Sequence, residues 1–252
     1  MLKLIKYELV GRYKYYLGFL IALILLNIYL ITKNNTWSHG LPFVISFMVA
    51  FSCFVAVFIS GVMLYQRDMY GNTGYLLFTL PQMGFDIAFS KLIISIIEFT
   101  LFVTVSGVMA FINLLYMNEA KAFIDAILQH KIFILYIFIS ALLSFIAVLI
   151  LSYFSITISK IAFYNKKHGK VLSLVLFLLI FYIIGKVTGL LVNLFPYNLN
   201  VSLFSGIAQR SDNFALSFAV LPINVASTIF QTLVYIGLFI LTSYLIDKKI
   251  DL

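Results

Sequence analysis

The stretch IFILYIFISALLSFIAVLILSYFSITIS occupies residues 132–159 and contains no charged side chain. A helix needs about 20 mostly apolar residues to cross the roughly 30 Å hydrocarbon core of a bilayer, and this run is long enough to cross with some tilt. Its backbone must be helical in lipid, because lipid offers no hydrogen-bond partner to exposed peptide groups. A transmembrane β-strand would alternate apolar and polar residues, whereas this run is apolar on every face. The stretch therefore predicts a membrane-spanning helix.

Five further runs have a similar length and composition: 15–32, 41–64, 92–117, 171–195 and 221–246. Of the 252 residues, 63% are hydrophobic and 10% are charged, whereas soluble domains are about a quarter charged. Lipid must therefore be the solvent for most of the chain. The sequence predicts an all-α membrane protein with six transmembrane helices, in which residues 1–252 form a single transmembrane domain.

The lysines and arginines predict the orientation of these helices. Twelve of the 17 lie in the N-terminal segment, in the loops after the second and fourth runs, and at the C-terminus; four lie in the opposite loops. Because short basic loops stay in the cytoplasm, both termini are predicted to be cytoplasmic. The net charge of +8 beside apolar runs favours anionic lipid headgroups over nucleic acid as a partner. The abundance of Ile, Lys, Phe, Tyr and Asn suits an AT-rich bacterial genome, so the predicted location is the bacterial cytoplasmic membrane.

Residues 1–14 have an amphipathic pattern. At 100° per residue one narrow apolar stripe is formed by Leu2, Ile5, Leu9, Tyr13 and Tyr16. Lysines lie beside the stripe, and Glu8 lies away from it. The pattern predicts an interfacial helix along the inner membrane surface, apolar side down. Such a helix is either a topology anchor or a surface on which partners dock.

The stretch YQRDMYGNTGYLLFTLPQMGFDIAFSK, residues 65–91, joins the second and third runs on the cytoplasmic side and is too long for a tight connection. Gly71, Asn72 and Gly74 indicate a turn. Four residues that follow are too apolar for a free loop: Leu76, Leu77, Phe78 and Leu80. They either contact another protein or fold back on the helices of this chain.

The segment 196–220 lies on the outer side, before the last run. It interleaves polar residues with Leu, Ile and Phe. That mixture favours short re-entrant or surface-lying helices.

The sequence contains no motif of nucleotide, metal or hydrolytic chemistry. It has no GxxxxGK[ST], HExxH or GxSxG pattern, and its three histidines fall in separate loops. We therefore expect no catalytic residue, no metal site and no cofactor on this chain. The single cysteine, Cys53, lies in an apolar run and is expected to be a packing residue.

Two ionisable residues lie within the predicted spans. Glu98 is in the third run and Lys186 is in the fifth. An unpaired charge in a span costs roughly 2.5–3.5 kcal/mol on insertion scales. Two interpretations of Lys186 avoid this cost. Either Lys186 lines a translocation path together with Asn193, or its long side chain extends to the outer headgroups. Glu98 can reach the inner headgroups in the same way.

Residues 65–91 carry a more specific pattern, in which an acidic residue, Gly-Tyr, Leu-Pro and a lysine follow one another: Asp68, Gly74-Tyr75, Leu80-Pro81 and Lys91. This pattern resembles the cytoplasmic loop of permease subunits of the ABC-2 family of ATP-binding-cassette transporters. The opening MLKLIKYELVGRYKYYLGFL is similar to that family's N-terminal amphipathic helix, and the six-span topology is similar over the whole chain.

The resemblance implies a transport mechanism. Two permease subunits, identical or related, form the membrane part, and two separate ATPase subunits bind ATP and Mg²⁺ beneath it. The N-terminal helix and the loop after the second span carry the nucleotide-driven movement to the spans. The implied coupling residues are Asp68, Gly74, Tyr75, Leu76, Leu77, Phe78, Leu80 and Pro81. The implied substrate is hydrophobic or peptidic, such as an antimicrobial peptide or a drug, and leaves the cell.

Two other classes of function remain open at this point. A membrane immunity protein would bind a membrane-active peptide without ATP, and would need no coupling loop. A membrane subunit of an importer would hold its ligand within one copy rather than between two copies.

Overall fold

In the computed structural model the described residues are 2–33, 37, 41–71, 83–116, 131–162, 166–201 and 221–249. The chain divides into two compact units. Unit 1 comprises Met1–Arg67 and Asp86–Asp125, and unit 2 comprises Asp68–Phe85 and Ala126–Leu252.

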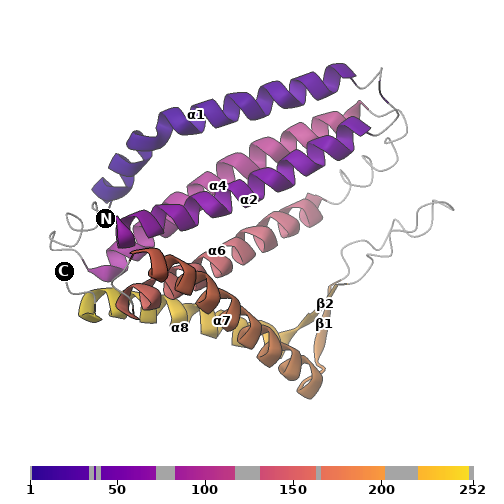
Figure 1. The fold of residues 1–252 in the computed structure, drawn as a ribbon. Helices are drawn as coiled ribbons and strands as arrows, with labels where there is room; N and C mark the ends of the chain where they lie inside the picture. Colours follow the sequence, from indigo (N-terminus) through magenta and orange to yellow (C-terminus); the bar gives the residue numbers. More distant parts are fainter. Residues whose placement is uncertain are drawn as a thin grey trace. The chain divides into compact units, whose positions relative to one another are not determined.

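Unit 1 is built from three long helices: α1 (Leu2–Lys33), α2 (Leu41–Tyr70) and α4 (Gly84–Leu115). They lie side by side (Figure 1). Edge-to-face aromatic pairs join them. Phe102 of α4 meets Phe19 of α1, and Phe99 of α4 meets Phe54 of α2. Such pairs add to the stabilisation from burial alone.

Unit 2 contains α6 (Lys131–Ala162), α7 (Lys166–Leu194) and α8 (Val225–Lys249), with α6 packed against both others. Between α7 and α8 lie β1 (Asn198–Val201) and β2 (Leu221–Asn224), which pair antiparallel. Asn224 ends β2 and also caps α8, because its side-chain oxygen accepts a 3.0 Å hydrogen bond from the Ser227 N–H.

Six helices of the described residues are long and apolar enough to cross a membrane. This confirms the prediction of six long apolar helices that make up most of the chain. Five of the six predicted runs match their helices to within two residues at the ends or lie inside them. The sixth, 221–246, begins with the strand β2, so its helix starts at Val225. The bacterial cytoplasmic membrane as the location, and the cytoplasmic side for both termini, stay predictions.

The predicted loop 65–91 is shorter in the structure. α2 continues to Tyr70 and α4 starts at Gly84, so both ends of the stretch are helical. Tyr65 and Tyr70 at one end, and Ile87 and Lys91 at the other, are buried. These side chains have tertiary partners, and packing therefore extends the helices beyond the apolar runs.

The segment 196–220 begins with a strand, not with one of the predicted helices. Asn198 faces Asn224 in the register of the two strands. Residues 202–220, where the re-entrant helices were expected, lie outside the described residues.

Candidate functional site

The first ion pair of unit 1 joins α1 to α4. The Lys91 ammonium donates to the Glu8 carboxylate. Lys91 lies two turns inside α4, and its side chain is 0% exposed. A lysine withdrawn fully from solvent needs a counter-charge, and Glu8 supplies it.

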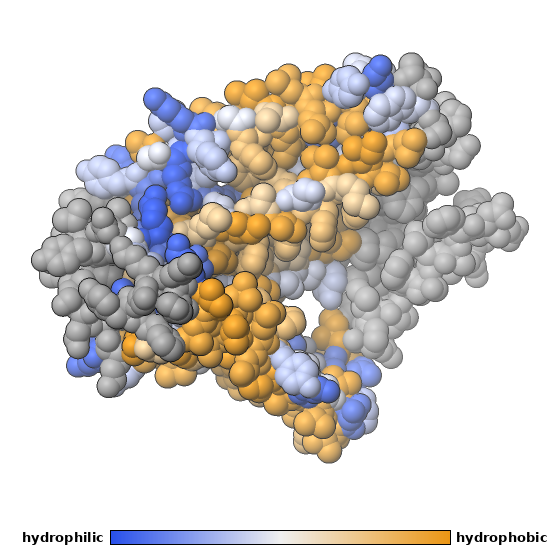
Figure 2. Space-filling model, viewed as in Figure 1, coloured by the Kyte–Doolittle hydropathy of each residue, from blue (hydrophilic) through white to orange (hydrophobic). Residues whose placement is uncertain are grey.

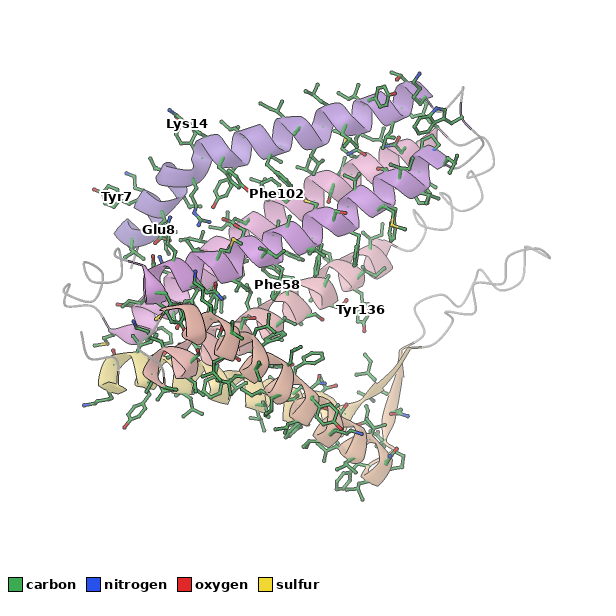
Figure 3. All side chains as sticks on the ribbon, viewed as in Figure 1. Tyr7, Glu8, Lys14, Phe58, Phe102 and Tyr136 are labelled. Atoms are coloured by element: carbon green, nitrogen blue, oxygen red, sulfur yellow. The ribbon has the colours of Figure 1, made fainter. Side chains whose placement is uncertain are left out.

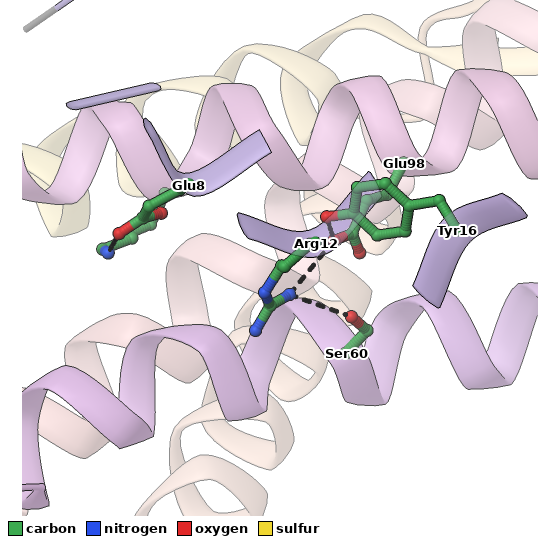
Figure 4. A network of polar contacts seen from close by, with 6 residues as sticks. Glu8, Arg12, Tyr16, Ser60 and Glu98 are labelled. Carbon is green, nitrogen blue, oxygen red and sulfur yellow. Dashed lines mark hydrogen bonds and ion pairs between the residues drawn. The ribbon is translucent and has the colours of Figure 1, made fainter. Parts of the chain in front are cut away.

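The second ion pair lies deeper along the same two helices (Figure 4). Arg12 Nη1 donates to Glu98 Oε1 at 3.2 Å, and the Tyr16 hydroxyl donates to the same oxygen. Arg12 also reaches Ser60 Oγ on α2, at 3.5 Å. The Glu98 side chain is 2% exposed. The carboxylate predicted to extend towards the inner headgroups is therefore held by partners within unit 1.

The two pairs have opposite polarity. α1 contributes an acid and then a base, Glu8 and Arg12, and α4 contributes a base and then an acid, Lys91 and Glu98. Because the pairs occur in the same order along both helices, α1 and α4 run parallel. A shift by one helical turn would bring like charges together, so the pattern fixes the register of α1 on α4.

The apolar stripe predicted to face the membrane surface packs against protein instead. Ile5 forms a buried cluster with Leu64 of α2 and Ile94 of α4, and Leu9 and Ile93 pack around it. Tyr13, in the same predicted stripe, is half-exposed, and the side chain of Leu2 lies outside the described residues. Residues 2–14 continue into α1 without a break, and a separate interfacial helix stays a prediction.

A second polar cluster lies further along the helices of unit 1. Ser46 Oγ donates to Asn27 Oδ1 at 2.6 Å, and Asn113 Nδ2 lies 3.3 Å from both oxygens. All three side chains are buried. The cluster joins α1, α2 and α4 by hydrogen bonds.

The two ends of the stretch between α2 and α4 are anchored within unit 2. At one end, the Tyr70 hydroxyl donates to Ser159 Oγ of α6 at 3.1 Å. A Cβ at Gly169 of α7 would lie 2.8 Å from the Tyr70 ring. At the other end, the Gly84 N–H donates to the Asp247 carboxylate of α8. The residues that flank 71–83 thus contact all three long helices of unit 2.

Among the predicted coupling residues, the structure describes Asp68, which is buried near the end of α2. The others lie outside the described residues: Gly74, Tyr75, Leu76, Leu77, Phe78, Leu80 and Pro81.

The predicted path residues Lys186 and Asn193 lie on α7, two turns apart, and both are exposed. Lys186 Nζ lies 5.5 Å from the centre of the Tyr182 ring, a cation–π contact along the same helix.

Sequence reasoning missed the partners of Glu98. Glu8, Arg12 and Tyr16 are spaced four residues apart and therefore share one face of a helix. An acid inside a span requires a partner, and this face offers an arginine and a tyrosine hydroxyl. That signal was available from the sequence.

Figure 2 shows hydrophobic residues over most of the visible surface of α1 and α2, with hydrophilic residues gathered at the first turns of α1. Among the described residues, no three His, Cys, Asp or Glu side chains are grouped to hold a metal ion. What the arrangement provides is mechanical: it holds α1, α2 and α4 in register. Comparisons with protein families, with curated proteins and with solved structures find no match.

Proposed function

We propose that this chain is the transmembrane permease subunit of an ATP-binding-cassette exporter, with both termini in the bacterial cytoplasm. The observation that carries the proposal is the attachment of the N-terminal segment to both helices that flank residues 71–83. Ile5 packs on Leu64 at the end of α2 and on Ile94 near the start of α4, and Glu8 pairs with Lys91. This arrangement supports a role in which the N-terminal helix and the stretch 71–83 move together.

The anchors in unit 2 extend the argument. Tyr70 contacts α6 and α7, and Gly84 contacts α8. A push on residues 71–83 would therefore reach these helices directly through the two ends of the stretch. Such a connection is what a subunit without an energy source of its own needs if a separate ATPase drives it.

In this proposal, ATP and Mg²⁺ bind to partner ATPase subunits, and a second identical or related permease completes the membrane part. The substrate is hydrophobic or peptidic and leaves the cell, with Lys186 and Asn193 of α7 beside its path. The apolar residues of 74–81 contact the ATPase, whereas Asp68 is buried within this chain and supports the end of α2 from inside.

The deciding experiment is the isolation of the tagged full-length chain from detergent-solubilised membranes of its own host. We expect a stoichiometric partner that contains a P-loop ATPase motif. Recovery of the chain alone, under conditions that hold a known transporter together, would instead favour an immunity protein that binds its peptide without ATP.

Two substitutions test the coupling role once the partner is in hand. Leu80→Asp and Pro81→Ala are expected to lower the stimulated ATPase rate while membrane insertion stays normal. Trp37→Asp places the same charge in the loop that is predicted to lie on the opposite side, and is the matched control. Unchanged stimulation in both loop variants would remove this stretch from the coupling mechanism.

A further inference from the structure

The first turns of α1 separate their charges between two faces. The inward face carries Glu8 and Arg12, which are paired with Lys91 and Glu98 and are neutral as a set. The outward face carries Lys6 and Lys14, and both are exposed. Glu8 is the only acidic residue of α1, so the outward face has no counter-charge on its own helix. Among the described residues, neither lysine makes an ion pair.

Tyrosines accompany these lysines. Tyr7 is 74% exposed, and Tyr13 and Tyr15 are also exposed. Figure 3 shows Tyr7 and Lys14 projecting from α1 on the side away from α2 and α4, whereas Glu8 points towards them. Exposed tyrosines and lysines at one end of a spanning helix are typical of the headgroup layer, where an amphipathic ring and a cation both find partners.

The length of α1 places this face in that layer. Its 32 residues extend over about 48 Å, which exceeds the roughly 30 Å hydrocarbon core and is about the full bilayer thickness with headgroups. From Leu17 to Ile28 the exposed residues of α1 are apolar, including Ile21 and Leu25. The apolar part therefore occupies the hydrocarbon core, and the turns with Lys6 and Lys14 stand among the headgroups.

We propose that the outward face of the first turns of α1, formed by Lys6, Tyr7, Val10, Tyr13 and Lys14, binds the headgroups of anionic phospholipids. The lysines attract the phosphates, and the tyrosine rings lie at the boundary between headgroups and acyl chains. This face lies beside the apolar stripe: Ile5 and Leu9 of the stripe pack on α2 and α4, whereas Tyr13 is exposed and belongs to the face that meets lipid. The proposal rests on α1 crossing the bilayer and does not depend on a transport function.

The test uses the full-length chain in detergent, titrated with phosphatidylglycerol or with phosphatidylcholine and observed by native mass spectrometry. Each bound lipid gives a resolved mass step, from which stepwise affinities follow. A lysine near an anionic surface contributes about fivefold in affinity, so we expect Lys6→Gln with Lys14→Gln to weaken the tightest phosphatidylglycerol site about 25-fold. Binding of phosphatidylcholine should not change.

Two controls make the result specific. Lys170→Gln with Lys248→Gln removes the same charge from exposed positions of α7 and α8, and should leave the tight site within twofold. Lys6→Arg with Lys14→Arg keeps the charge and should keep the affinity. Unchanged phosphatidylglycerol affinity in the Lys6/Lys14 glutamine variant would overturn the proposal. An equal loss of phosphatidylglycerol affinity in the Lys170/Lys248 variant would overturn it too. If the Lys6/Lys14 glutamine variant kept its lipid affinity but no longer co-purified with a protein that accompanies the parent chain, the face would be assigned to that protein.

Discussion

Glu98 and Lys186 pose the same problem in the sequence and have different solutions in the structure. Each is an ionisable residue inside an apolar helix. Glu98 is on α4, and 39% of the most apolar stretch of that helix is buried inside the protein. Lys186 is on α7, where only 6% of the corresponding stretch is buried. Glu98 is held by Arg12 and Tyr16, and Lys186 is exposed over the Tyr182 ring of its own helix.

The difference shows that a charged residue in a membrane-spanning helix can have a structural role. At Glu98 the charge fixes the register of α1 on α4, together with the opposite pair formed by Glu8 and Lys91. At Lys186 the charge lies over the Tyr182 ring of the same helix, and among the described residues it makes no ion pair. The contrast yields four predictions, taken here from the largest effect to the smallest.

The largest effect is expected at Glu98. Glu98→Gln leaves Arg12 partly buried without a counter-charge, and breaking a buried pair by removing one partner costs about 3 kcal/mol. The free energy of unfolding of the purified protein in mixed micelles, titrated with sodium dodecyl sulfate, measures this loss. The double variant Arg12→Glu with Glu98→Arg should recover part of the stability. If Glu98→Gln were as stable as the parent chain, the ion pair would contribute nothing to the packing of α1 on α4.

The next effect is expected at Gly84, where α4 begins against α8. A Cβ there would lie 2.7 Å from both the Ile246 Cβ and the Ser243 carbonyl oxygen. Gly84→Ala must therefore displace backbone, and overpacking of this kind costs about 1–3 kcal/mol. Gly107→Ala, on the same helix with nothing within 4 Å of the added Cβ, is the control and should stabilise by up to about 1 kcal/mol. Equal melting temperatures of the two variants would show that the start of α4 does not depend on α8.

The apolar runs were enough to predict the helices, because length and hydropathy alone decide whether a segment can cross a bilayer. The ends of the helices were less predictable: Tyr70 and Gly84 are helical because they pack on distant elements, which no local pattern contains. Glu98 was recognised as anomalous, but its partners were not, because assigning residues 1–14 to the membrane surface removed Arg12 from consideration. The strands at Asn198 and Leu221 depend on pairing across a long segment, a contact that composition does not reveal.

A smaller effect is expected at Ser46, in the uncharged cluster of unit 1. Ser46→Ala removes the hydroxyl that donates to Asn27 and lies 3.3 Å from Asn113. Hydrogen bonds between helices in membranes contribute about 0.6 kcal/mol on average, with a maximum near 1.7 kcal/mol. Ser52→Ala, on the same helix, removes only a bond to the helix's own Met48 carbonyl and should change less. A larger loss at Ser52 than at Ser46 would contradict the role of the cluster in joining the three helices.

The smallest effect on stability is expected at Lys186, and it completes the comparison with Glu98. Because Lys186 is exposed and contacts only Tyr182 of its own helix among the described residues, Lys186→Met should change the free energy of unfolding by less than about 0.5 kcal/mol. If Lys186 lies beside a translocation path, the same variant should alter the rate or range of export of membrane-active peptides in proteoliposomes that contain the partner ATPase. Lys186→Arg, which keeps the charge, should transport normally. Unchanged export in the methionine variant would assign the lysine to the outer headgroups. A loss of stability as large as that of Glu98→Gln would show that Lys186, like Glu98, is held by packing.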